Sequence, residues 1–114
     1  MLPVSERAMK QITEHTTVDP ELSLIKQYIM HGWPSRKACD VLAKPYFNVS
    51  HELYIVNNVI FKGNCIVVPK SLRKGMLQQI HTGHLGEAKC KARARGILYW
   101  PGMSSYISNI SLLV

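Results

Sequence analysis

The segment from residue 53 to residue 68 contains three short apolar runs that are separated by two-residue polar pairs. Asn57-Asn58 divides the first run from the second, and Gly63-Asn64 divides the second from the third. Asparagine and glycine tolerate the left-handed backbone conformation that two-residue hairpin turns require. This pattern predicts an antiparallel meander of three strands. It constrains the fold strongly, because it requires a sheet in a chain whose other segments carry helical signals.

The segments before the meander are expected to be helical. Residues 4–15 place apolar side chains near helical spacing, and a second helix begins after Asp19 with Pro20 at its first position. The missing N–H of proline costs nothing there. Gly32 ends this helix, and one further turn of helix is expected at residues 35–42.

Three helices are expected after the meander, in a helix-turn-helix-like unit. Residues 72–80 form the first, residues 86–95 form the second, and Gly96 closes the second. A third begins near Pro101. The predicted fold class is therefore α+β, with N-terminal helices and a three-stranded antiparallel meander followed by three C-terminal helices.

Pro69 marks the expected boundary between two regions. Residues 1–69 are predicted to be a helical and β-meander lead-in region, and residues 70–114 the three-helix unit. No apolar run approaches the ~18 residues of a membrane span, and residues 1–10 lack the apolar core of a signal peptide. We expect an intracellular protein with no membrane partner and no small-molecule substrate.

The net charge of +7 is unevenly distributed along the sequence. Residues 1–61 carry equal numbers of basic and acidic side chains. The whole excess lies in residues 62–114, where Glu87 is the acid and the cations are Lys62, Lys70, Arg73, Lys74, Lys89, Lys91, Arg93 and Arg95. A basic half suits phosphate backbones or acidic protein surfaces. A solvated basic face without a polyanion partner is the structural alternative.

Four of these cations lie on the predicted helix 86–95. Lys89 and Arg93 are four residues apart, and so are Lys91 and Arg95, so each pair shares one side of the helix. Such a helix could lie along a phosphate backbone. The alternative is a solvated helix that packs through its alanines, with all four cationic side chains facing water.

The metal-ligand candidates are His81 and His84, which flank a glycine and can turn toward one point. A closed zinc site needs four ligands, and the only later cysteine, Cys90, is expected to face the core. From the spacing alone, the two histidines could equally be structural residues or solvated side chains.

Tyr99 and Trp100 could stack on bases, but we expect them to clamp the turn between two helices.

Together these motifs resemble the H2C2 zinc-binding domain of Ty3/gypsy-type retrotransposon integrases. The C-terminal elements that match are Ile80-His81-Thr82-Gly83-His84-Leu85-Gly86, Lys89, Arg93, Arg95 and Tyr99-Trp100-Pro101-Gly102-Met103. Upstream elements also match: Asp19-Pro20-Glu21-Leu22, Gly32-Trp33-Pro34, Glu52-Leu53 and Ile66-Val67-Val68-Pro69-Lys70-Ser71-Leu72-Arg73. The upstream elements resemble the segment between ribonuclease H and integrase in Pol polyproteins, and the resemblance covers residues 18–110.

The resemblance implies that His81 and His84 are two of the family's four zinc ligands. The other two form a CxxC pair on the last helix, which would begin near Val114 and is not in the sequence. The catalytic DDE core follows the zinc domain in that family, and no acidic residue occurs after Glu87. We therefore expect a chain cut off before the CxxC and the catalytic core, with an incomplete zinc site.

The predicted function is that of a non-catalytic integrase-like region that binds nucleic acid, with DNA as the expected partner, or assists integrase-type assembly. Lys89, Lys91, Arg93 and Arg95 are the expected phosphate contacts, and a nuclear location would fit that role. Two alternatives remain. One is a zinc-independent protein-interaction module that self-associates through the meander edge or through residues 112–114, and the other is a non-functional coding remnant.

Overall fold

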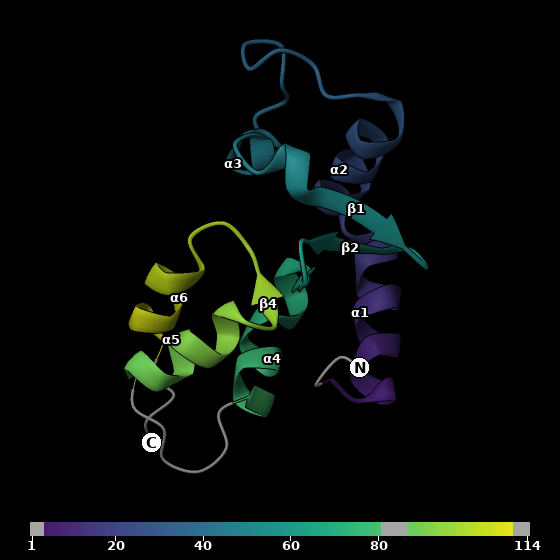
Figure 1. Cartoon of the computed structure of the whole chain (residues 1–114). Coiled ribbons are helices and arrows are strands. Elements are labelled where there is room, and N and C mark those ends of the chain that lie inside the picture. Colours follow the sequence, from purple (N-terminus) through teal and green to yellow (C-terminus); the bar gives the residue numbers. More distant parts are fainter. Residues whose placement is uncertain (1–3, 81–86, 111–114) are drawn as a thin grey trace.

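The computed structural model describes residues 4–80 and 87–110. Its elements in chain order are α1 (Glu6–Val18), α2 (Pro20–His31), α3 (Lys44–Phe47), η1 (Ser50–Glu52), β1 (Leu53–Val56), β2 (Val59–Lys62), β3 (Cys65–Val67), η2 (Lys70–Leu72), α4 (Arg73–Ile80), α5 (Glu87–Arg95), β4 (Leu98–Tyr99) and α6 (Met103–Asn109). The mixture of helices with one sheet confirms the α+β class (Figure 1).

The predicted meander is confirmed. β1 pairs antiparallel with β2, and β2 pairs antiparallel with β3. Asn57 and Asn58 adopt φ values of 50° and 68°, which place both residues of the turn in the left-handed region. This geometry matches the twist of the flanking strands, so the two asparagines explain why the chain reverses at this position.

A fourth strand, β4, extends the sheet to the order β1-β2-β3-β4. It runs parallel to β3, with Ile66 opposite Leu98 and Val67 opposite Tyr99. Tyr99 was expected in a turn between two helices, so this strand was not predicted. The sheet therefore crosses the expected boundary near residue 69, while the division into regions 1–69 and 70–114 stays a prediction.

The two long N-terminal helices begin at polar caps. The Ser5 side chain accepts a hydrogen bond from the Ala8 N–H at 3.1 Å, and the Asp19 carboxylate accepts one from the Leu22 N–H at 3.0 Å. These bonds satisfy amide groups that the first helical turn leaves unpaired. α1 extends to Val18, three residues beyond its expected end.

The predicted helical turn at residues 35–42 is wrong. These residues form turns, and the helix at this position is α3, which carries Pro45 in its first turn. The Asp40 carboxylate accepts a hydrogen bond from the Leu42 N–H at 2.9 Å. Such local side-chain bonds offer the backbone an alternative to a helix.

Helices cover both faces of the sheet and create two cores (Figure 1). The first core joins one face to helices α1, α4, α5 and α6, and its buried members are Ala8, Ile12, Val59, Phe61, Ile66, Val68, Met76, Leu77, Ile80, Cys90, Ala94, Leu98, Trp100, Met103 and Ile107. The second core joins the other face to α2 and α3, and its buried members are Leu22, Ile25, Cys39, Ala43, Tyr46, Leu53, Ile60 and Val67. Alternate strand residues enter different cores because successive side chains point to opposite faces.

Within residues 4–80 and 87–110, no helix has the length and apolar character needed to span a bilayer.

Candidate nucleic-acid interface

Helix α5 packs on the first core through one side only. Cys90 and Ala94, four residues apart, are both buried in that core. Ala88 and Ala92 are exposed, so Ala94 alone of the three alanines packs on the core. The cationic side chains project from the rest of the helix surface.

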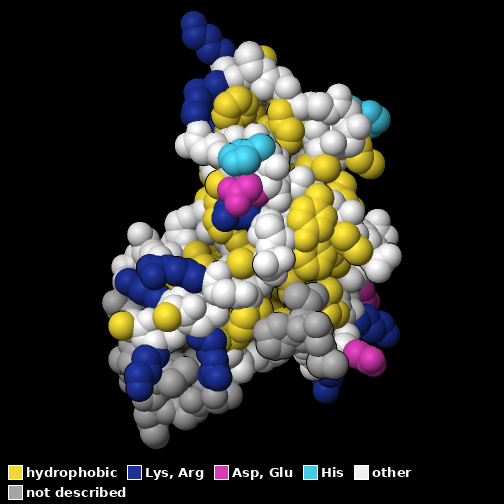
Figure 2. Space-filling model, viewed as in Figure 1, with side chains coloured by type: hydrophobic (Ala, Val, Ile, Leu, Met, Phe, Trp, Pro, Cys, Tyr) yellow, Lys and Arg dark blue, Asp and Glu magenta, His cyan; other side chains and the backbone are white. Residues whose placement is uncertain are grey.

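The four predicted phosphate contacts do not share one environment. Lys89, Arg93 and Arg95 are exposed, whereas Lys91 is half-buried. Figure 2 shows Lys and Arg side chains gathered over the lobe that contains α5 and α6. The structure therefore brings a basic surface together on this lobe, as the distribution of charge along the sequence indicated.

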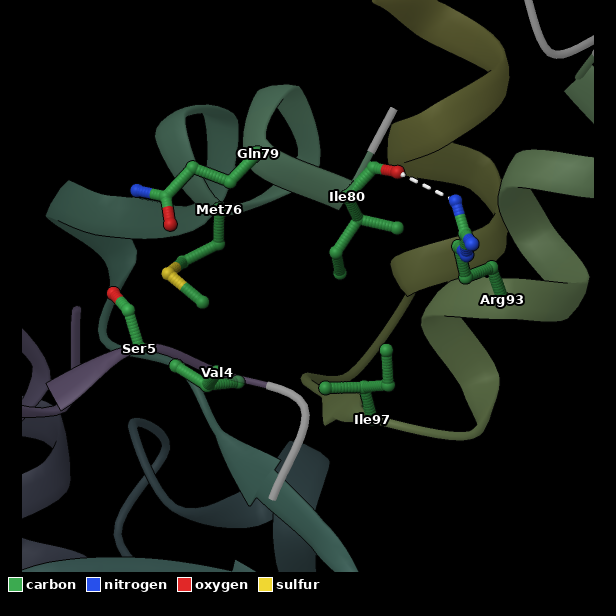
Figure 3. Close-up of a pocket in the computed structure, with 7 residues that line it drawn as sticks. All are labelled: Val4, Ser5, Met76, Gln79, Ile80, Arg93 and Ile97. Atoms are coloured by element: carbon green, nitrogen blue, oxygen red, sulfur yellow. Dashed lines mark hydrogen bonds between the residues drawn. The ribbon is translucent and has the colours of Figure 1, made fainter. Parts of the chain in front are cut away.

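Both arginines on α5 also hold neighbouring elements. Arg93 donates from Nη1 to the carbonyl oxygen of Ile80 at 3.2 Å, which joins α5 to the end of α4 (Figure 3). Arg95 donates from Nη2 to Ser104 Oγ on α6 at 3.2 Å. Both arginines are exposed and yet hydrogen-bonded. Sequence spacing could not reveal these bonds, because their partners lie on other helices.

A pocket of about 290 Å³ lies beside the Arg93 contact. Figure 3 shows its lining residues, which come from the start of α1, from α4 and from the α5–β4 segment: Val4, Ser5, Met76, Gln79, Ile80, Arg93 and Ile97. The Ser5 hydroxyl oxygen already caps α1. The walls are mainly apolar, so this pocket adds little to the basic surface itself.

Two cations of the basic half are paired with acids of the charge-balanced half. Lys62 Nζ lies 3.6 Å from Glu52 Oε1, and Arg73 Nη2 lies 3.9 Å from Glu21 Oε1. Salt-bridged groups release no counterion when they meet a phosphate, so neither is a good candidate contact. Of the other cations in residues 62–114, four lie on α5, whereas η2 and α4 carry one each, Lys70 and Lys74.

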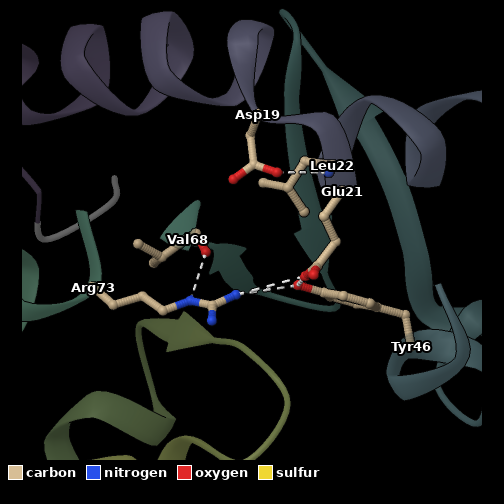
Figure 4. Close-up of polar contacts among 6 residues, drawn as sticks. All are labelled: Asp19, Glu21, Leu22, Tyr46, Val68 and Arg73. Atoms are coloured by element: carbon tan, nitrogen blue, oxygen red, sulfur yellow. Dashed lines mark hydrogen bonds and ion pairs between the residues drawn. The ribbon is translucent and has the colours of Figure 1, made fainter. Parts of the chain in front are cut away.

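Arg73 lies at the centre of a polar network between the two cores (Figure 4). Its Nε donates to the carbonyl oxygen of Val68 at 3.3 Å, and its Nη2 donates to Tyr46 Oη at 3.3 Å. Tyr46 in turn donates to Glu21 Oε1 at 3.0 Å. Burial, with a further contribution from the Glu21 carboxylate, raises the pKa of Tyr46 far above its ordinary value. The network is structural and connects α2, α3 and α4.

The aromatic pair before Pro101 has the structural role that we expected. Trp100 is buried in the first core and meets Tyr106 edge to face at 5.4 Å. Tyr99 is half-buried on β4 and contacts Tyr46 edge to face at 6.5 Å. The buried Trp100 ring is not available to stack on a base.

The expected zinc ligands His81 and His84 lie outside the described residues. Among residues 4–80 and 87–110, no three His, Cys, Asp or Glu side chains gather in a way that could hold a metal ion. Cys90 is 1% exposed, and burial raises the pKa of its thiol, which disfavours the thiolate that zinc requires. Zinc binding by the two histidines therefore stays a prediction, and Cys90 is a poor candidate for a further ligand.

Comparison with known proteins defines the class of this region. Residues 68–111 match the family model described as the integrase zinc binding domain. The match confirms the resemblance of this part of the chain to the integrase H2C2 zinc-binding region. The match covers the zinc-binding region and no catalytic core.

A relative from Caenorhabditis elegans, named "Uncharacterized protein K02A2.6", is 28% identical over 92 residues. The aligned residues cover 81% of this chain and 7% of that protein, so the chain spans a small part of the length of its relative. No solved structure matches the chain.

Proposed function

We propose that this chain is a non-catalytic, retrotransposon-derived integrase region that binds nucleic acid through the basic surface on α5. The single observation that carries the proposal is the position of that helix. It is anchored through Cys90 and Ala94, so its exposed surface carries Lys89, Arg93 and Arg95 toward solvent. Cations held on a rigid helix suit contacts to phosphate oxygens.

The bonds made by the arginines support this role. An arginine side chain has five N–H donors, and the hydrogen bond of Arg95 to Ser104 uses one of them. A guanidinium that is already held in position loses less entropy when it meets a phosphate. We therefore assign Arg95 both a structural contact with α6 and a phosphate contact.

The absence of catalysis is proposed from the family match and the chemistry of the sequence. The matched model is a zinc-binding domain, and no acidic residue follows Glu87 in the sequence. Strand transfer by a two-metal mechanism requires carboxylates that hold the metal ions. Purified chain incubated with element-end DNA and magnesium or manganese should give no 3′-end processing or strand transfer.

The direct test of binding is a salt titration of the chain with duplex DNA of several unrelated sequences. Phosphate contacts predict an affinity that falls steeply as salt rises and differs little between sequences. Binding that is absent at low salt would refute the proposal, and binding that is insensitive to salt would require a different interface.

A further inference from the structure

Strand β1 forms an outer edge of the sheet. In an antiparallel hairpin with a two-residue turn, the two residues that flank the turn exchange two backbone hydrogen bonds, and hydrogen-bonded pairs then alternate with non-hydrogen-bonded pairs. In β1, the backbone groups of Val56 and Tyr54 therefore bond to β2. The Gly63 N–H donates to the Glu52 carbonyl at 3.1 Å, which continues the alternation. Ile55 lies between these positions, and its N–H and C=O therefore point outward along the edge of the sheet.

Tyr54 is a rigid aromatic side chain beside this edge. Its ring stacks on Phe61 with a centroid distance of 5.5 Å and an interplanar angle of 14°. Its hydroxyl donates to the carbonyl oxygen of Gly63 at 2.6 Å. Tyr54 is nevertheless 43% exposed, and Val56, on the same face of β1, is 46% exposed. Rigid tyrosines in uncharged surroundings are typical anchors of protein interfaces.

Figure 2 shows hydrophobic side chains gathered over β1, at a distance from the basic lobe. The order of the sheet explains this separation, because β1 and β4 form opposite edges and β4 directly follows α5. Residues 1–61 carry no net charge, whereas residues 62–114 carry the whole excess of +7. Two copies that meet at β1 therefore join neutral regions and keep their basic lobes apart.

We propose that β1 pairs antiparallel with β1 of a second copy of this chain, around a two-fold axis at Ile55. The Leu53 N–H already donates to the Ser50 carbonyl, so Ile55 is the β1 residue that offers both backbone groups at the edge. Pairing at Ile55 forms two hydrogen bonds between the copies. It also places Tyr54 of each copy opposite Val56 of the other, which covers both exposed side chains.

This interface is small, since the strand has four residues, and it belongs with weak, concentration-dependent dimers rather than obligate ones. It needs neither zinc nor nucleic acid. Contacts between uncharged groups are not screened by salt, so dimerisation persists at salt concentrations that abolish binding to DNA. This difference separates the failure of the dimer from failure of the proposed DNA-binding function.

Analytical ultracentrifugation of the whole chain over a range of concentrations tests the proposal. The wild-type chain should show a monomer–dimer equilibrium that is unchanged by added salt. Tyr54→Asp and Val56→Asp should each raise the dissociation constant by about tenfold or more, because each buries a carboxylate in the interface. Val41→Asp is the matched control, since Val41 is 75% exposed but lies outside the sheet, and it should dimerise as the wild type does.

A mixing experiment tests the register itself. Tyr54→Lys chains mixed with Val56→Asp chains place opposite charges across the strand pair, so the mixed dimer should be more stable than either dimer alone. Thermal melts show whether each variant is folded. The proposal would be overturned if the wild-type chain stays monomeric or if Val41→Asp weakens dimerisation as much as the edge variants do. It would also be overturned if the mixed dimer is no more stable than either dimer alone.

Discussion

Arg93 Nη1 lies 3.2 Å from the carbonyl oxygen of Ile80. A side chain of α5 therefore provides a hydrogen-bond donor for the carbonyl group of the last residue of α4. The final carbonyls of a helix have no partner within it, and a cation placed there also interacts favourably with the helix dipole. Arg93 thus stabilises the fold as well as contributing charge to the proposed interface. This hydrogen bond gives Arg93 a structural role that we do not assign to Lys89, which lies one helical turn earlier on α5.

Arg93→Gln should therefore lower the free energy of unfolding by about 1 kcal/mol, because a charge-assisted hydrogen bond is lost at a partly exposed site. Lys89→Gln is the matched control, since Lys89 is also exposed on α5, and a surface change of this kind stays within about 0.5 kcal/mol. Urea denaturation measures the free energy of unfolding of both variants. Equal midpoints for the two variants would contradict a structural role of Arg93.

Thr16 offers a prediction of increased stability. Its side chain is fully buried, and its Oγ1 has no hydrogen-bond partner among the described residues. Thr16→Val keeps the shape and removes the unsatisfied hydroxyl, so the free energy of unfolding should rise by about 1 kcal/mol. Thr13→Val is the control, because Thr13 Oγ1 donates to the Met9 carbonyl at 2.9 Å and its removal should bring no gain. Destabilisation by Thr16→Val would imply a partner for this hydroxyl.

Tyr46 predicts a dependence of stability on alkaline pH. Its pKa is raised in the folded chain, so above about pH 10 the unfolded chain releases the phenol proton first. The contribution of Tyr46 is therefore complete below that pH and is lost as the pH rises further. Tyr46→Phe should cost about 1–2 kcal/mol at neutral pH through its lost hydrogen bonds, and the difference from wild type should shrink above about pH 10. Unfolding curves of the wild type and Tyr46→Phe that are equally far apart at neutral pH and above about pH 10 would contradict this account.

Local signals predicted the meander and the three C-terminal helices. The asparagine turn is encoded by two adjacent residues, and each helix by its own spacing of apolar side chains. β4 escaped prediction because Leu98 and Tyr99 form only two strand residues. Their partners on β3 lie about thirty positions earlier, and sequence periodicity contains no information on such a pairing.

The sequence predicted which segment of the candidate site carries the positive charge, but not which contacts its side chains make. The concentration of positive charge on residues 87–95 is visible in the sequence. The contacts of Arg93 with Ile80 and of Arg73 with Tyr46 are not, because they depend on how separate elements pack. Cys90 was correctly expected in the core, since a small apolar side chain at that point continues the buried side of α5.

Zinc content tests whether the described cysteines take part in metal binding. Two histidine ligands hold zinc weakly compared with a closed four-ligand site, so dialysed chain should retain well under one zinc per molecule. Cys90→Ala should leave that content unchanged while lowering stability, because it removes a buried thiol from the first core. A stoichiometric, chelator-resistant zinc that Cys90→Ala abolishes would contradict this expectation.

Binding to duplex DNA by a variant that loses positive charge on α5 tests the central claim most directly. Lys89→Gln with Arg95→Gln should weaken binding and reduce the slope of log affinity against log salt by roughly 2, one for each lost phosphate contact. Lys10→Gln with Lys37→Gln removes the same charge from the balanced half, so its slope should stay close to that of the wild type. If the two double variants bind with the same affinity and the same slope, α5 is only a solvated helix and the account is contradicted.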